Sequence, residues 1–310
     1  MSEALPSTMD AADIWIIVPA WNTRDLLAAC LASIPDVRLG RTVVVDNGSS
    51  DGTVTMLRDR FPAVRVVENP DNLGFARAVN QGAALTVSRY VLFLNSDAIL
   101  EPGAIEALAV VLESQPQAGL VGSRLLYPDG SFQASFAPFP TLLHEFLILS
   151  GVGRLLYGSS YPSKGPEEER GPQTVDYVGG ACMLARRSAF EQVGGFDEGY
   201  FLYAEEVDLC HSLWGHGWDV WYQPAAVVLH AESGSSRSQA GRREAMLYRS
   251  RVRFFRKHRG VAAANILKAM IFFFTAAKIP LHAVLRFVSG GRLGREVVAI
   301  GQLVGALRGV

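Results

Sequence analysis

Four short apolar runs, separated by segments of helical length, constrain the fold more than any other feature of this sequence. They cover residues 14–18, 42–45, 64–67 and 90–94. Strands that are apolar along their whole length are typical of a mostly parallel sheet covered by helices on both faces. We therefore predict an α/β fold in which one Rossmann-like domain holds most of the 310 residues.

Polar residues follow each of these runs at the point where the predicted strand ends. They form the segments PAWN at 19–22, DNGSSDG at 46–52, ENPDNLG at 68–74 and NSD at 95–97. Any one of them could be a turn and nothing more. Because ligands of open α/β sheets bind at the carboxyl ends of the strands, four such segments at one sheet edge predict a binding site there.

Charge divides the chain into an acidic body and a basic tail. Residues 237–310 hold fifteen Lys and Arg but only two acids, whereas residues 1–236 hold 14 basic and 28 acidic residues. We interpret residues 1–12 as a flexible N-terminus, 13–236 as the main domain and 237–310 as a helical extension. Such asymmetry favours a tail that meets an anionic surface. Nucleic acid is not expected as a partner, because the body has no recognition motif and would repel phosphates.

The three cysteines are far apart and odd in number, which argues against a disulfide framework or a cysteine zinc site. The first residues contain acids but no basic residue, so they do not resemble a signal peptide. We therefore expect a cytoplasmic protein. Nothing in the sequence indicates an oligomeric state.

Within the tail, residues 242–259 are rich in arginine and residues 260–285 are mainly apolar. At 100° per residue, Lys268, Lys278, His282 and Arg286 share an arc of about 80°. A narrow cationic stripe on an apolar helix suits a segment lying in a membrane interface, and no uninterrupted apolar run reaches the roughly 18 residues of a spanning helix. The alternative is that these helices pack on the body and their arginines pair with its surplus acids.

The motifs of residues 14–236 resemble those of family 2 glycosyltransferases, in the same order along the chain. The segments that carry the resemblance are VPAWN at 18–22, VDNGSSDGT at 45–53, NLGFA at 72–76, LNSD at 94–97, GGA at 179–181, GGFD at 194–197, YAEEVDL at 203–209 and the terminal His230. They look most similar to the rhamnosyltransferase-like branch. The resemblance implies a single GT-A domain with a mostly parallel central sheet.

The resemblance also implies an inverting transferase that moves a sugar from a nucleotide-sugar donor to a hydroxyl group. The acceptor would be a glycan or a polyprenyl-linked glycan used in cell-envelope polysaccharide synthesis, and dTDP-rhamnose is our expected donor. A basic, partly apolar tail would hold such an enzyme peripherally at the inner face of the cell membrane.

By resemblance, Asp46 accepts a hydrogen bond from the nucleobase, and Pro19 or Trp21 flanks the ring. The bland interpretation is that Asp46 only begins a turn. The resemblance completes the substrate site with a further set of residues from the same motifs and from the acidic cluster: Asn22, Asn72, Gly74, Arg77, Asn95, Gly179, Gly180 and Glu205.

Asn95, Ser96 and Asp97 occupy the position of the family's Asp-x-Asp motif, whose carboxylates hold a divalent metal at the donor diphosphate. Here the first Asp is Asn, which leaves Asp97 as the principal carboxylate. By the family's motif order His230 is a second ligand, although a histidine that ends an apolar run is ordinarily structural. The expected ion is Mn²⁺ or Mg²⁺, with Mn²⁺ favoured because imidazole is a softer donor than oxygen.

The acidic cluster of Glu205, Glu206 and Asp208 holds the candidates for the catalytic base. By resemblance the base is the second residue of a Glu-Asp pair, which is Glu206 here, with Asp208 as the rival. The bland interpretation is an acidic first turn stabilised by the helix dipole. Since Asn95 and Glu206 both depart from the family pattern, the alternative function is a non-catalytic nucleotide-sugar-binding or membrane scaffold protein.

Overall fold

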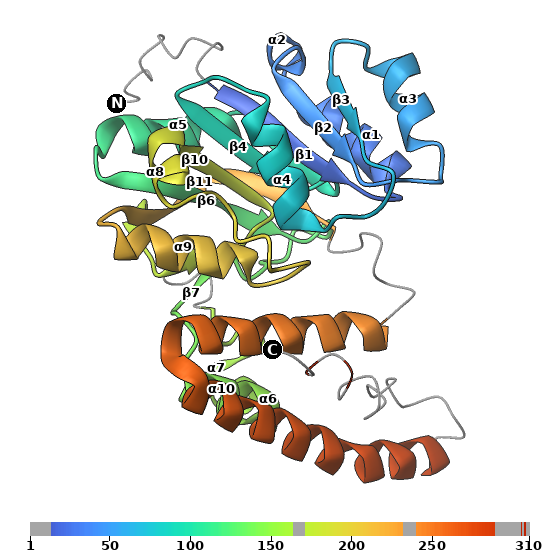
Figure 1. Ribbon diagram of the computed structural model, residues 1–310, viewed down its shortest axis with the longest axis vertical. Helices are drawn as coiled ribbons and strands as arrows, with labels where there is room; N and C mark the ends of the chain where they lie inside the picture. The colour runs from blue at the N-terminus through green and yellow to red at the C-terminus, as the bar shows by residue number, and fades with distance from the viewer. Residues whose placement is uncertain (1–13, 164–170, 232–239, 289–304, 306, 308–310) are drawn as a thin grey trace.

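The computed structural model describes residues 14–163, 171–231, 240–288, 305 and 307, and the side chains of 240–242 and 278–288 lie outside that description. The predicted N-terminus at 1–12, the boundary at 236 and three cations of the predicted stripe, Lys278, His282 and Arg286, therefore fall outside the described residues or side chains. The main sheet has nine strands (Figure 1), which are β1 (Ile14–Ala20), β2 (Thr42–Asp46), β3 (Arg65–Glu68), β4 (Tyr90–Leu94), β5 (Ala98–Leu100), β6 (Ala118–Leu126), β8 (Gln173–Thr174), β10 (Cys182–Arg186) and β11 (Asp219–His230).

Sheet order runs β3-β2-β1-β4-β10-β6-β11-β5, and β8 pairs with β11. The four strands expected from the apolar runs form one parallel block, because β1 pairs in parallel with both β2 and β4, and β2 with β3. Strand β10 is antiparallel to β4 and β6, while β11 is parallel to β6 and antiparallel to β5. The α/β fold with its parallel block of predicted strands is thus confirmed, and the sheet as a whole is mixed. Strands β2 and β4 are buried along their whole length, as their apolar sequences require.

Helices cover both faces of the sheet (Figure 1). One face is packed by α1 (Arg24–Ser33), α3 (Thr53–Arg60) and α5 (Ala104–Ser114), and the other by α4 (Phe75–Ala84), α8 (Arg187–Gln192) and α9 (Glu205–Gly215). The remaining elements are α2 (Asp36–Leu39), a small sheet of β7 (Phe136–Ala137) and β9 (Tyr177–Val178), and the helices α6 (Leu142–Ser150), α7 (Val152–Tyr157) and α10 (Ala240–Val288).

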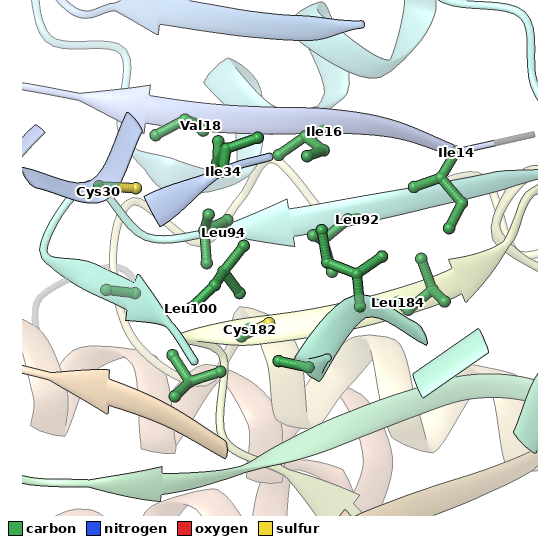
Figure 2. Close-up of a cluster of buried hydrophobic side chains, with 14 of the residues drawn as sticks. Ile14, Ile16, Val18, Cys30, Ile34, Leu92, Leu94, Leu100, Cys182 and Leu184 are labelled. Atoms are coloured by element: carbon green, nitrogen blue, oxygen red, sulfur yellow. The ribbon is translucent and has the colours of Figure 1, made fainter. Parts of the chain in front are cut away.

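The first core layer consists of alternate strand residues that point to the same face of the sheet (Figure 2). Ile14 and Ile16 on β1, Leu92 on β4 and Leu184 on β10 are all fully buried. Burying a branched or aromatic side chain of this size contributes about 1.5–3 kcal/mol each. This layer fixes the strands rigidly, and the polar segments that follow them are therefore held in place.

Helix α10 bends at Gly260, whose φ of 85° and ψ of 170° are not helical. The two halves and α6 enclose a third core cluster below the body (Figure 1). The first half pairs with acids of the body: Arg251 with Glu145 at 3.0 Å, and Arg253 with Asp197 at 2.9 Å. The alternative that the basic helix packs on the body therefore describes this half.

The described residues contain one helix, Arg243–Ala277, that is long and apolar enough by length and composition to cross a membrane. From the sequence we expected no segment long enough to span a membrane, because no apolar run of about 18 residues is uninterrupted. The helix meets the length because single charged residues within it are tolerated. The bend at Gly260 divides it, and its first half is attached to the body by the ion pairs described above.

Candidate functional site

The polar segments that follow the parallel strands meet at one edge of the sheet, as predicted from the sequence. The Asn47 amide donates to the Ala20 carbonyl at 2.8 Å, and the Asn69 amide donates to the Asp46 carbonyl at 2.8 Å. The Thr23 hydroxyl donates to the Ser96 hydroxyl at 3.0 Å. Residues that are far apart in the sequence thus form a continuous polar rim.

Asp46 has one buried carboxylate oxygen that is free to accept a hydrogen bond. Its Oδ2 accepts from the Ser49 amide at 2.9 Å, whereas Oδ1 is buried without a partner among the described residues. A buried carboxylate oxygen without a donor is costly, so it indicates a ligand N–H. Pro19 on β1 pairs with Val45 on β2, and Val45 directly precedes Asp46. Pro19 is therefore close to Asp46 in the sheet.

Asn22 and Trp21 follow β1, and both are partly buried. Asn22 has a positive φ of 51°, and its side-chain oxygen accepts from the Ser50 amide at 2.8 Å. Its own amide donates to the Ser49 hydroxyl at 2.8 Å. Asn22 therefore shapes the segment that carries Asp46, which is a positioning task.

Asn72 and Gly74 shape the turn that leads into α4. The Asn72 side-chain oxygen accepts from the Gly74 amide at 2.9 Å. Gly74 has φ of 87°, and a Cβ there would lie 2.6 Å from the Phe201 carbonyl oxygen, so no other residue fits. Arg77 is half-exposed and pairs with Glu198 at 3.4 Å, at a cavity bordered by Arg249 and other residues of α10.

Asp97 and His230 lie together, as the resemblance implied. His230 Nε2 is 3.2 Å from Asp97 Oδ1 and 3.3 Å from Asn95 Nδ2. The other ring nitrogen, Nδ1, is 2.8 Å from the side-chain oxygen of Gln133. Because that oxygen accepts, Nδ1 donates to it, and Nε2 is left to face Asp97 Oδ1 and the Asn95 side-chain nitrogen. Gln133 was not predicted, since no motif of the sequence marks it.

This arrangement fits a divalent cation. An imidazole nitrogen and a carboxylate oxygen 3.2 Å apart are close enough to bind one cation together. Asn95 Oδ1 is in addition buried without a partner among the described residues. No group of three or more His, Cys, Asp or Glu suited to a metal occurs in the described part of the chain. Asp97, His230 and Asn95 would thus supply only part of the coordination shell, and oxygens of the substrate would supply the rest.

The segment 179–181 links this pair to the acidic cluster. The Asn95 amide donates to the Ala181 carbonyl at 2.9 Å. On the other side, a Cβ at Gly180 would lie 3.4 Å from Glu206 Cβ. A Cβ at Gly179 would lie 3.0 Å from a Leu125 methyl group. This segment therefore contacts Asn95 through Ala181 and Glu206 through Gly180.

Glu205 and Glu206 begin α9, and burial perturbs both. Burial, together with the neighbouring Glu206 charge, raises the pKa of Glu205 well above its usual range, and Glu205 Oε2 has no partner among the described residues. Burial raises the pKa of Glu206 to about 7. Glu206 can therefore gain and release a proton near neutral pH.

Glu206 faces a cavity of about 150 Å³ between the body and the C-terminal helices. Tyr177, His144 and Tyr203 supply polar groups there, and Arg251 lies across from them beside its partner Glu145. The apolar part of the wall comes from α6 and α10, through Ile148, Leu247, Phe254 and Phe255. A small cavity with one acid of raised pKa and a few polar groups is a typical substrate site.

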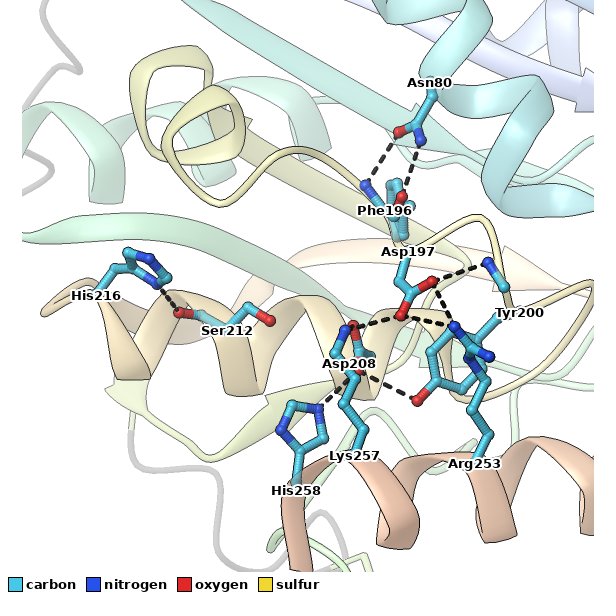
Figure 3. A network of polar contacts seen from close by, with 11 residues as sticks. Asn80, Phe196, Asp197, Tyr200, Asp208, Ser212, His216, Arg253, Lys257 and His258 are labelled. Atoms are coloured by element: carbon cyan, nitrogen blue, oxygen red, sulfur yellow. Dashed lines mark hydrogen bonds and ion pairs between the residues drawn. The ribbon is translucent and has the colours of Figure 1, made fainter. Parts of the chain in front are cut away.

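Asp208 has a different environment (Figure 3). It is 2% exposed, and its carboxylate accepts from Lys257 at 2.8 Å, from the Tyr200 hydroxyl at 3.2 Å and faces His258 at 2.7 Å. Lys257 also donates a hydrogen bond to Asp197. Burial acts to raise the pKa of Asp197, but the Lys257 hydrogen bond helps to lower that pKa to about 2. Asp208, the rival base, thus lies in an ion-pair network that holds α10 on α9.

The fold and this site define a GT-A glycosyltransferase. The solved mannosyltransferase from Pyrobaculum calidifontis in complex with GDP-Man and Mn²⁺ has a similar fold, with a TM-score of 0.55 at 17% identity, over 98% of this chain and 88% of that one. The family model for glycosyl transferase family 2 matches residues 15–194. The chain belongs to that family.

Among curated proteins, the N-acetylglucosaminyl-diphospho-decaprenol L-rhamnosyltransferase of Mycobacterium tuberculosis is 36% identical over 213 residues, which are 63% of this chain and 67% of the relative. Rhamnosyltransferase WbbL of Escherichia coli is 32% identical over 155 residues, or 48% of this chain and 54% of the relative. The rhamnosyltransferase-like resemblance of the sequence is thereby confirmed.

Proposed function

We propose that this protein is an inverting transferase that moves rhamnose from a nucleotide-sugar donor to a hydroxyl of a polyprenyl-diphosphate-linked glycan. The observation that supports the proposal is the pair of contacts made by the 179–181 segment, which bonds Asn95 through Ala181 and lies against Glu206 through Gly180. The named acceptor and sugar of the mycobacterial relative support the choice of substrates.

Donor binding would use the rim formed by the strand ends. Asp46 Oδ1 would accept the imide N–H of a pyrimidine, with Pro19 and Trp21 flanking the ring. Asp97, His230 and Asn95 would hold a divalent cation, with Mn²⁺ suited to the mixed nitrogen and oxygen set. When bound, that cation offsets the charge that develops on the leaving nucleoside diphosphate.

Acceptor activation would fall to Glu206. Its ionised carboxylate takes the proton of the acceptor hydroxyl as that oxygen bonds the anomeric carbon, and the bond from this carbon to the nucleoside diphosphate breaks on the opposite side. One attack from the face opposite the leaving group inverts the anomeric carbon. The cavity at Glu206 holds the hydroxyl in position, and in this role Glu206 provides about 10²–10⁴-fold of the acceleration.

Asp208 is the less suitable base, because its carboxylate oxygens already face Lys257, His258 and Tyr200. Glu205 would position the sugar or the acceptor beside Glu206. Asn22, Asn72 and Gly74 would act by shaping the loops that carry Asp46 and Glu205.

The test is transfer from dTDP-rhamnose to N-acetylglucosaminyl-diphospho-polyprenol with added Mn²⁺, after a thermal-shift screen of nucleotide-sugar donors. We expect a product whose anomeric configuration is opposite to that of the donor, determined by NMR. Asp97→Asn should raise the Mn²⁺ concentration needed for half-maximal rate by tenfold or more, whereas Asp51→Asn, a matched change in a neighbouring turn, should leave it unchanged.

A product that retains the donor configuration would refute the inverting mechanism. Donor binding without turnover by any form of the protein would favour the scaffold alternative instead. Turnover of another sugar nucleotide with no rate for dTDP-rhamnose would keep the transferase and overturn the donor.

A further inference from the structure

Helices α6 and α7 form a hairpin whose outer face is apolar. Leu155 is 84% exposed, and Leu156 and Tyr157 are 63% and 65% exposed. On α6, Leu143 is 65% and Phe146 45% exposed. A surface helix in water normally turns its polar side outward, so this hairpin has the opposite arrangement.

The second half of α10 continues the same face. Phe146 of α6 packs its ring 5.5 Å from that of Phe274. Beside it, Ile266 is 50% and Phe273 65% exposed, and the other exposed positions of this part of the helix are small or uncharged: Val261, Ala262, Asn265, Ala269, Ala276 and Ala277. This ring contact joins two elements that are more than a hundred residues apart in the sequence and lie side by side below the body (Figure 1). We call the exposed apolar residues of α6, α7 and the second half of α10 the α6–α7–α10 face.

Charge on this face has one sign. No acidic residue occurs at 146–163 or at 245–277. Arg154 of α7 is exposed, as are Arg256 and Arg259 just before the bend, and none of the three forms an ion pair with a described residue. An apolar surface edged by unpaired arginines is complementary to a bilayer with anionic headgroups.

We infer that the α6–α7–α10 face docks on an anionic lipid bilayer, with Leu155 and Leu156 inserted below the headgroups. This extends membrane contact from the basic tail to an internal hairpin, and the inference goes with the proposed lipid-linked acceptor. A second copy of the chain fits less well, because a two-fold interface would bring arginines against arginines.

The same helix that carries exposed Leu143 and Phe146 also lines the cavity of Glu206, through His144 and Ile148 on its other side. A docked hairpin would therefore place the acid close to the bilayer surface. An acceptor anchored by a polyprenyl chain could then present its sugar to Glu206 without leaving the membrane.

The experiment measures co-sedimentation of the full chain with phosphatidylcholine vesicles, with and without phosphatidylglycerol. The variant is Leu155→Glu with Leu156→Glu. The matched control is Val37→Glu with Val87→Glu, two valines that are 74% and 90% exposed on other parts of the body. Each pair adds the same charge at exposed sites, so circular dichroism and the unfolding midpoint should be unchanged in both.

We expect binding that increases with phosphatidylglycerol, a partition coefficient at least tenfold lower for the leucine pair, and a change below about threefold for the valine pair. Equal loss in both pairs, or none in the leucine pair, would overturn the inference. So would a wild-type dimer, seen by light scattering without vesicles, that the leucine pair converts to a monomer. Vesicle binding needs neither donor nor acceptor, so its failure is distinct from a failure of the proposed transfer reaction.

Discussion

Replacing Glu206 by Gln should stabilise the protein at neutral and alkaline pH while abolishing most of its activity. Burial raises the pKa of Glu206 to about 7, from the ordinary 4.5 of a glutamate. The folded state therefore binds this proton more tightly than the unfolded state. Between pH 4.5 and about 7 the wild-type protein therefore loses stability as pH rises, because the buried Glu206 carboxylate becomes charged.

The size of the effect follows from the pKa difference. A shift from 4.5 to about 7 corresponds to roughly 3 kcal/mol at most. Because the Glu206 side chain is only partly buried from solvent, we expect about 1–3 kcal/mol. Glutamine carries no charge, so the variant should exceed the wild type in stability by this amount at pH 8 and match it near pH 4. In a chain of this size the gain is about 2–6 °C in Tm at pH 8.

The assay compares unfolding midpoints across pH 4 to 9 with kcat at pH 8. Glu198→Gln is the matched control, because that carboxylate is 51% exposed and its removal should not change the pH slope. We expect Glu206→Gln to lower kcat by about 10²–10⁴. If the variant instead shows the wild-type pH slope, the burial argument is wrong. If it keeps its turnover, Glu206 is not the base.

Two further predictions concern residues that we assign to structure. Asp208→Asn should lower the free energy of unfolding by about 2 kcal/mol. This is less than the about 3–5 kcal/mol for breaking a fully buried pair, because Lys257 is 39% exposed and keeps its partner Asp197. Tm should fall by several degrees and kcat by less than threefold, and a stable variant without turnover would make Asp208 the base. Gly74→Ala should lower the free energy of unfolding in urea by about 2–4 kcal/mol, and Gly130→Ala should lower it by about 1 kcal/mol. Both glycines have a positive φ, but only a Cβ at Gly74 would meet a carbonyl oxygen, that of Phe201. Equal costs would show that Phe201 moves aside.

The strands that could be predicted are those whose sequences are apolar throughout. The runs at 14–18, 42–45 and 90–94 all lie in strands that begin at the predicted residue. Strand β10 illustrates the opposite case. Its antiparallel place between β4 and β6 depends on pairing partners about sixty to ninety residues away, which no local pattern specifies.

For the candidate site, the sequence indicated residue types and the resemblance indicated roles, but neither gave orientation. Asp208 was a reasonable base by spacing, and only the positions of Lys257 and His258, some fifty residues later, show that its carboxylate is engaged. Gln133 was missed for a related reason. It lies outside the motifs, and its contact with His230 joins residues that are 97 positions apart in the sequence.

The charge division of the sequence has a structural explanation that bears on function. Acids of the body, Glu145, Asp197 and Asp208, pair with cations of the first half of α10, so that half is fixed as a wall of the Glu206 cavity. Beyond Gly260 the helix exposes apolar residues such as Ile266 and Phe273. The bend thus separates two tasks in one helix: its first half completes the site, and its second half, with the α6–α7 hairpin, provides the surface for which we propose a lipid partner.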